Sequence, residues 1–288
     1  MQKKEHKMIR EFYIENDKGQ RFSMMDIENS CFLNSPSGLG YSYNTEYAQI
    51  GDNFIQNIRK ITQGSISGEL IFKKYDNYKL FIDFIESATD LKFVYKVPFE
   101  DGYKEYFKDI DISSVEKTEI EEGHILRVPV NFNCKSLWYE AKDVTITINP
   151  ISNELRWDFK WDSIFTSYDS NNINFENKGH TEAPFKIELD GEISNPVITI
   201  LEDGEEVSSL DLDGLVISSG EKFIYNTKDT EQQIIKKSGS TITNLFTYLN
   251  PNFINFFKLR KGESTIRLEA DNEITGGKIT IYIQYKAV

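Results

Sequence analysis

Carboxylate side chains are the residues of this chain that could most readily do chemistry. Glu188, Glu192, Asp211 and Asp213 are grouped in its second half. Two carboxyl groups held at a fixed separation in a cleft could serve as the acid and base of a glycosidase. Aspartate in an Asp-Gly turn has a structural reason for its position, however, because its side chain hydrogen-bonds its own backbone. We therefore expect no catalytic residues and no enzymatic activity.

A second acidic group and the histidines also lack the context of a catalytic site. The acidic group precedes Gly123 and is expected to form an exposed hairpin end; it consists of Glu116, Glu119, Glu121 and Glu122. The histidines lie in a polar tail, in this acidic turn and in a loop, at His6, His124 and His180. Neither a nucleophile motif nor a phosphate-binding or zinc-protease motif accompanies them. We expect neither cofactor nor metal.

Cys31 and Cys134 are far apart in the sequence, and neither belongs to a CxxC pair or a Cys/His ligand pattern. A zinc site is therefore not expected. They could form a disulfide if the fold brought them together, but burial as two small apolar residues is the favoured interpretation.

The charge of the chain disfavours nucleic acid as a partner. The formal net charge is −13, and both halves are acidic, whereas phosphate binding needs clustered Lys and Arg. Short basic runs occur only at Lys3 to Lys7 and Lys258 to Lys261, and we expect both to be solvated surface. The first 16 residues lack the apolar core of a signal peptide, and no later run is long enough to span a membrane. We expect a soluble chain that is neither exported by a signal peptide nor bound to a membrane.

An aromatic ladder lies at 155–161. In an extended strand Leu155, Trp157, Phe159 and Trp161 would share one face. Such rings either stack on carbohydrate or form the inner face of a β-sandwich, and packing is the favoured interpretation. Trp157 and Trp161 remain the candidate carbohydrate-binding residues.

The first half of the sequence, residues 1–145, is predicted to form an α+β domain. A hairpin is expected around Asn16 to Gly19 and a loop at 34–45, which is rich in Ser, Gly and Asn. One amphipathic helix is predicted at 75–88, with Asp76 as its cap, because apolar residues recur there at helical spacing. The strand at 125–132 contains Pro129, which favours an edge or a bulge. Further strands are predicted at 61–72, 91–97 and 103–112.

The second half predicts an antiparallel β-sandwich or jelly roll, 146–288, because short strands alternate with Gly turns. Around residue 179 a Gly and Pro184 precede an alternating strand and an Asp190-Gly191 turn. A single helical turn is allowed near 243–248. The strands are predicted at 144–148, 185–189, 197–201, 206–210, 215–218, 223–225, 233–236, 253–259, 264–269 and 278–285, and further turns at 203–204, 213–214, 219–220, 261–262 and 276–277.

Several motifs, in order along the chain, resemble the distal tail protein (Dit) family of siphophages and phage-tail-like particles of Gram-positive hosts. In the first half these are GSISGELIFKKYDNYKLFIDFI, a strand that enters a helix, and LRVPVNFNCKSLWYE, with its Ser-x-Trp-Tyr ending. In the second half they are Gly179, Pro184, Gly191, Asn195-Pro196, Gly220-Glu221 and Phe257-Lys258-Leu259. Gly262-Glu263-Ser264 departs from the family's usual Gly-x-Asn, which leaves the chemistry of that turn in doubt.

The resemblance implies a structural role without catalysis. Members of the family form a ring, commonly a hexamer, through a belt-like N-terminal domain, and carry a galectin-like C-terminal sandwich. The ring joins the tail tube to the tail-tip or tail-associated lysin protein, with the tape measure and receptor-binding proteins as further partners. The implied location is the virion tail tip, assembled in the host cytoplasm. A different class of function also remains open: a carbohydrate-binding module that uses Trp157 and Trp161, or Trp138.

Overall fold

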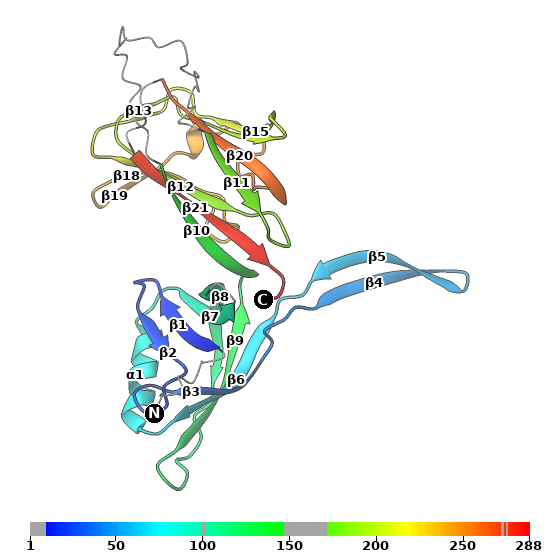
Figure 1. Ribbon diagram of the computed structural model, residues 1–288, viewed down its shortest axis with the longest axis vertical. Coiled ribbons are helices and arrows are strands. Elements are labelled where there is room, and N and C mark those ends of the chain that lie inside the picture. Colours follow the sequence, from blue (N-terminus) through cyan, green and yellow to red (C-terminus); the bar gives the residue numbers. More distant parts are fainter. Residues whose placement is uncertain (1–9, 100–101, 147–171, 272–273, 275) are drawn as a thin grey trace, which may run out of the picture. The chain divides into compact units, whose positions relative to one another are not determined.

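The computed structural model describes residues 10–99, 102–146, 172–271, 274 and 276–288. It is mainly β, with one α-helix among these residues, which confirms the predicted fold class. The described residues divide into two compact units (Figure 1). The first ends at Glu140 and includes Tyr285–Val288, and the second is Ala141–Gln284.

The first unit contains a sheet whose neighbouring strands are all antiparallel. Its order is β2-β1-β7-β8-β9-β6-β3, and β10 also pairs with β8 through Tyr139 and Phe107. The strands are β1 Glu11–Asn16, β2 Arg21–Ser23, β3 Phe32–Ser37, β6 Ser65–Phe72, β7 Leu91–Phe99, β8 Gly102–Val115, β9 Leu126–Cys134 and β10 Trp138–Ile146. The hairpin predicted around residues 16–19 is the turn between β1 and β2.

Helix α1, Tyr75–Glu86, confirms the predicted helix, and its buried face includes Phe81 and Ile85. The cap differs from the prediction. Lys74 is the N-cap and makes no side-chain cap bond, and Asp76 lies inside the first turn. A carboxylate there still stabilises the helix N-terminus, because the helix dipole is positive at that end.

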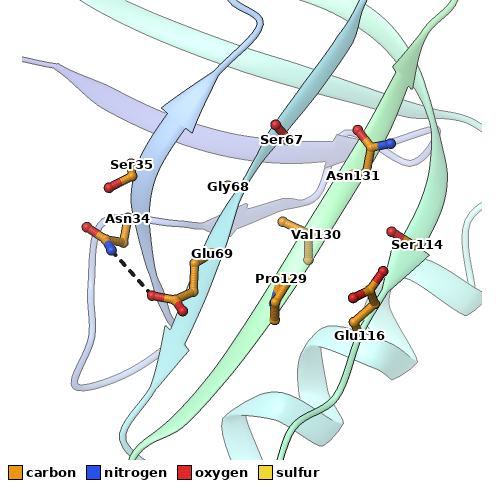
Figure 2. A pocket seen from close by; sticks show the side chains of 10 residues that line it. All are labelled: Asn34, Ser35, Ser67, Gly68, Glu69, Ser114, Glu116, Pro129, Val130 and Asn131. Atoms are coloured by element: carbon orange, nitrogen blue, oxygen red, sulfur yellow. Dashed lines mark hydrogen bonds between the residues drawn. The ribbon is translucent and has the colours of Figure 1, made fainter.

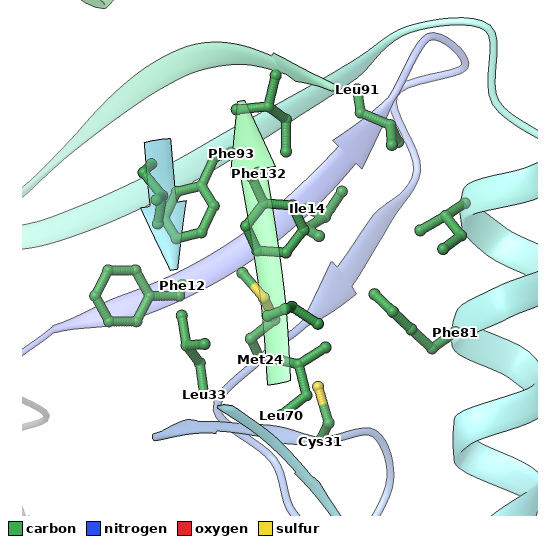
Figure 3. Packing of buried hydrophobic residues seen from close by; sticks show 14 of the residues in the cluster. Phe12, Ile14, Met24, Cys31, Leu33, Leu70, Phe81, Leu91, Phe93 and Phe132 are labelled. Atoms are coloured by element: carbon green, nitrogen blue, oxygen red, sulfur yellow. The ribbon is translucent and has the colours of Figure 1, made fainter. Parts of the chain in front are cut away.

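The core of the first unit combines aromatic rings with aliphatic side chains (Figure 3). Phe81 of α1 lies 5.3 Å from the ring of Phe22 and 5.9 Å from that of Phe72, so the helix packs on the sheet through rings. Phe93 and Phe132, on β7 and β9, also meet in this core, with ring centroids 5.9 Å apart. Alternation along β9 buries every second residue, as expected for a strand with one face toward a core.

Two sequence predictions for the first unit were wrong in whole or in part. The stretch 34–45 is not one loop, because β3 continues to Ser37, with a bulge after Asn34, and β4 begins at Tyr43. Strand β9 is internal and not an edge, since β6 and β8 pair with its two sides; the other predicted alternative, a bulge, is present in its pairing with β8, between Ile112 and Ser114. Proline has no backbone N–H to donate to a neighbouring strand. Pro129 is tolerated here because β8 ends at Val115, so the edge of β9 at Pro129 lies where the pairing with β8 stops.

Gly68 lies on β6 opposite the bulge of the neighbouring strand β3, and this position tests the packing of the sheet. A Cβ there would stand 2.8 Å from Leu33 Cδ1 and 3.1 Å from the Asn34 carbonyl oxygen. We expect Gly68→Ala to lower the free energy of unfolding by about 1–3 kcal/mol, because the added methyl overpacks the core. The matched control is Gly40→Ala, whose Cβ would meet nothing within 4 Å. Chemical denaturation compares them, and equal stability of the two variants would contradict the packing argument.

The second unit contains two larger antiparallel sheets that form a β-sandwich, with a small sheet of β13 and β16. One larger sheet has the order β11-β20-β14-β15, and the other includes β19-β18-β17-β12-β21. The strands are β11 Asn172–Asn177, β12 Phe185–Asp190, β13 Ile193–Ser194, β14 Val197–Glu202, β15 Glu205–Asp211, β16 Val216–Ile217, β17 Lys222–Asn226, β18 Gln233–Ser238, β19 Thr241–Asn244, β20 Gly262–Glu269 and β21 Gly276–Tyr285.

The prediction of a strand at 253–259 is wrong. This stretch is irregular and contributes a single bridge, Leu259 to Ala183. Its apolar residues are divided between core and surface, because Phe257 is buried whereas Phe253 and Ile254 are exposed. The helical turn allowed near residue 246 is the 3-10 helix η1, Phe246–Tyr248. The residues 276–277 begin β21 and do not form a turn.

The hydrogen-bonded side-chain amide of Asn177 fixes the connection between β11 and β12 near residue 179. The Asn177 Nδ2 group donates to the carbonyl oxygens of Thr181, Leu259 and Arg260, at 3.0, 3.2 and 3.2 Å. Its Oδ1 accepts from the Gly179 N–H at 2.9 Å. A Cβ at Gly179 would lie 2.6 Å from the Gln284 carbonyl oxygen. The close approach of two backbones therefore requires glycine here.

Candidate assembly surface

A two-stranded hairpin leaves the body of the first unit, and we name it the arm (Figure 1). It consists of β4, Tyr43–Ile50, and β5, Asn53–Ile61, which pair with each other and with no other described strand. Gly51 occupies the first position of the two-residue turn, with φ +63°. Two-residue hairpin turns require positive φ there, which glycine adopts at no steric cost.

The arm exposes large apolar side chains on both of its faces. Following the register from Tyr43↔Ile61, one face carries Tyr47 and Phe54, and the other carries Ile55 and Ile58, with a bulge between Glu46 and Tyr47. The exposed fractions are 61% for Tyr47, 67% for Phe54, 55% for Ile55 and 36% for Ile58. All nine residues of β5 are exposed. The arm therefore has no core of its own on either face.

An isolated two-stranded ribbon is at best marginally stable in water, since it buries too little apolar surface to offset the ordering of its backbone. The arm also leaves both outer strand edges unpaired among the described residues, and such edges are templates for pairing with another chain. Exposed apolar faces together with open edges are the properties of a surface that another protein covers.

The root of the arm is tied to the C-terminal residues of the same unit. Tyr43 lies edge-on to Tyr41 at 5.3 Å, and the Arg59 guanidinium stands 3.8 Å above the Tyr43 ring. The Lys286 Nζ group donates to the Tyr43 hydroxyl at 3.0 Å. This hydrogen bond is the main cause that lowers the pKa of Tyr43. These contacts hold the root of the arm against the C-terminal residues of the unit.

A shallow hollow of about 590 Å³ lies over strands β3, β6, β8 and β9 (Figure 2). At one side Asn34 Nδ2 donates to Glu69 Oε2 at 3.3 Å, and Arg127 pairs with the same oxygen at 2.9 Å. The Asn131 Oδ1 atom is buried and has no hydrogen-bond partner in the described part of the chain. The side chains of Glu69, Glu116 and Asn131 line the hollow, and their oxygen atoms can accept hydrogen bonds from donors of a partner surface.

The candidate residues from the sequence are not brought together into one site. Asp211 and Asp213 both line a groove in the second unit. Glu188 pairs instead with Lys186 at 3.1 Å. The acidic group before Gly123 is an exposed turn between β8 and β9, as predicted, and His124 lies in that turn with φ +63°.

The structure bears on only one of the three tryptophans that could stack on carbohydrate. Trp157 and Trp161 lie outside the described residues. Trp138 is fully buried, and its Nε1 group donates to the Leu39 carbonyl oxygen at 2.8 Å. The hypothesis that Trp138 stacks on sugars is therefore wrong, because no ligand could reach its ring.

Cys31 and Cys134 are both free and buried, which confirms their interpretation as small core residues. Burial raises the pKa of each thiol, because a thiolate is poorly solvated in an apolar interior. We expect neither thiol of the native chain to react measurably with a disulfide reagent such as DTNB at pH 8. Two thiols per chain should react once the chain is unfolded in guanidinium chloride. Fast reaction of one thiol in the native state would show that its part of the core opens.

The described residues contain neither a metal-binding cluster nor a membrane-spanning helix. No group of three or more His, Cys, Asp and Glu side chains is arranged there to hold a metal ion. Within the same residues, no helix has the length and apolarity needed to cross a membrane.

Sequence reasoning missed the arm, although a signal was present. Gly51-Asp52 is a turn dipeptide between two stretches rich in Tyr and Ile. The apolar residues of 43–61 fall on both faces, so the period-two pattern that marks a half-buried strand is weak. The many Asn, Gln and Ser residues nearby favour a loop interpretation.

Comparison with known proteins gives this architecture a context. Residues 11–135 match the family model of the distal tail protein, N-terminal domain. A chain of the phage P2 baseplate, in its activated conformation with Ca, has 17% identical residues and a TM-score of 0.69, and the match covers 98% of this chain and all of that one. The Dit protein of phage SPP1 has 12% identity and a TM-score of 0.57, and the match covers 94% of this chain and 98% of that one. No curated protein sequence matches the chain significantly.

The two kinds of comparison agree. The match of the N-terminal domain covers β1 to β9 together with α1 and the arm. The structural matches extend the shared fold over nearly the whole chain. Residues 11–135 are therefore a distal tail protein N-terminal domain, and the chain as a whole shares its fold with the SPP1 Dit protein and with a chain of the phage P2 baseplate.

Proposed function

We propose that the chain assembles with copies of itself into a ring, most simply a hexamer, and that the arm is the element that joins neighbouring copies. The observation that carries this proposal is the exposure of apolar side chains on both faces of β4 and β5. In this proposal the arm of one copy binds a different surface of the next copy, which makes the contact heterologous, and such contacts generate rings when the rotation closes.

The ring would act as the hub of a tail tip. In this role the N-terminal domain, 1–145, forms the belt and the C-terminal domain, 146–288, a galectin-like sandwich that faces outward. The tail tube protein would bind on one side of the ring and a tail-tip or tail-associated lysin protein on the other, with the tape measure and receptor-binding proteins as further partners. The SPP1 Dit protein is described as a paradigm of a hub adsorption apparatus in phages that infect Gram-positive bacteria, which supports this assignment. The hub would carry no catalytic residues, and would be assembled in the host cytoplasm and reside at the virion tail tip.

Mass measurement and electron microscopy of the purified full-length chain test the proposal. We expect light scattering at high protein concentration to give a closed oligomer of about six chains, and negative-stain images to show rings. A chain that stays monomeric at high concentration and shows no rings in micrographs would overturn the proposal.

A further inference from the structure

A groove of about 640 Å³ crosses the surface of the second unit. One wall is the edge strand β15 with the turn that follows it, and the other is the segment after η1, from Tyr248 to Asn255. Pockets that bind small ligands have volumes of about 300–1,000 Å³. The groove is therefore of a suitable size for a short oligosaccharide.

Aromatic rings stand exposed at this groove. Phe253 is 68% exposed and Tyr248 is 38% exposed, although buried rings of the same loop region, such as Phe257, show that the core could accept aromatic residues. An exposed ring offers a flat apolar surface. The C–H face of a pyranose packs on such a surface, whereas its hydroxyl groups need polar partners at the rim.

The polar groups of the groove are free and oriented. Asn255 Nδ2 donates to the carbonyl oxygens of Asn250 and Phe253, at 2.8 and 3.0 Å, so its Oδ1 remains an acceptor of fixed direction. Asn250 Oδ1 accepts from the Asn252 N–H at 3.0 Å, which leaves its Nδ2 as a donor. Across the part of the chain that the structure describes, the Asp211 and Asp213 carboxylates form neither ion pairs nor side-chain hydrogen bonds. Carboxylate and amide oxygens can each accept two hydrogen bonds, which suits neighbouring sugar hydroxyls.

The charge of the groove selects among carbohydrates. Glu206, Asp211 and Asp213 line it, and no Lys or Arg does. A sugar that carries phosphate or carboxylate groups would be repelled by these carboxylates. We propose that this groove binds a non-anionic carbohydrate, with Phe253 and Tyr248 stacking on the sugar ring and Asp211, Asp213 and Asn255 accepting its hydroxyl hydrogens.

The test uses the full-length chain and an array of immobilised oligosaccharides. The array carries neutral glucose, galactose, rhamnose and N-acetylglucosamine oligomers, and also a glycerol-phosphate polymer as an anionic probe. We expect binding to at least one neutral oligomer and none to the glycerol-phosphate polymer. For the bound oligomer, isothermal titration should show that Phe253→Ala and Asp213→Asn each weaken affinity at least about tenfold.

Val216→Ala is the matched control, since Val216 is 56% exposed in the same unit and does not line the groove. It should bind as the unchanged chain does. The proposal is overturned if no neutral oligomer binds, if the anionic polymer binds in preference, or if both groove variants keep full affinity. Ring formation is scored separately by mass, so failure of the groove and failure of the ring proposal are distinguishable.

Discussion

Replacing Phe54 and Ile55 with serine should abolish ring formation while leaving the folded monomer intact. The two side chains are 67% and 55% exposed and lie on opposite faces of the arm, so the monomer loses little burial when they are shortened. Covering each of them at an interface contributes about 1.5–3 kcal/mol. Loss of both should raise the dissociation constant of each subunit contact by about 100-fold or more. Light scattering over a dilution series measures the change.

The single variants show which face is covered. Phe54→Ser alone and Ile55→Ser alone should each weaken assembly if partners cover both faces of the arm, and only one should do so if a single face is covered. The control is Leu80→Ser, because Leu80 is 57% exposed on α1 and lies outside the arm. Rings that persist in the double variant would show that the arm does not hold them together.

Trp138→Ala should have the largest effect on the stability of the first unit, with a loss of about 3–5 kcal/mol. The indole is fully buried, it meets the rings of Phe93 and Tyr95 at 6.1 and 5.9 Å, and the Lys108 Nζ group stands 4.8 Å from its ring centroid. Truncation leaves a cavity and removes the partner of the Leu39 carbonyl oxygen. Chemical denaturation followed by far-ultraviolet circular dichroism gives the midpoint of the transition.

A second variant, Trp138→Phe, separates the cost of the cavity from the cost of the lost hydrogen bond. Trp138→Phe keeps an aromatic ring and removes the indole N–H, so it should cost clearly less than Trp138→Ala. Tyr103→Ala is the surface control, because Tyr103 is 45% exposed, and it should change stability by no more than about 0.5 kcal/mol. A Trp138→Ala chain as stable as the unchanged one would mean that the indole is not part of the core in solution.

The sequence predicted elements best where one local signal was strong. Helix α1 shows helical spacing of apolar residues, and the turn between β1 and β2 has an Asn/Asp/Gly sequence; both are present as expected. The strand predicted around Phe253 is absent because its local signal was misleading. Its apolar residues satisfy a strand pattern locally, but the sandwich buries Phe257 and leaves Phe253 and Ile254 outside, so pairing with a neighbouring strand never forms.

The functional predictions also depended on whether the signal was local in the sequence. The ordered motifs of the sequence were sufficient to indicate the family, because turn glycines and alternating strands leave traces in the order of residues. They could not show that Trp138 is inaccessible, since exposure depends on which strands meet around it. Nor could they bring Asp213 and Phe253 to one groove, 40 positions apart in the chain.

Local spacing and residue type were enough to predict the β-rich class, the helix near residue 80 and the absence of recognisable catalytic motifs. That residues 43–61 form an arm with two exposed apolar faces emerged from the folded chain alone. A strand's local pattern specifies that it pairs, whereas the exposure of its faces depends on what the rest of the chain leaves uncovered.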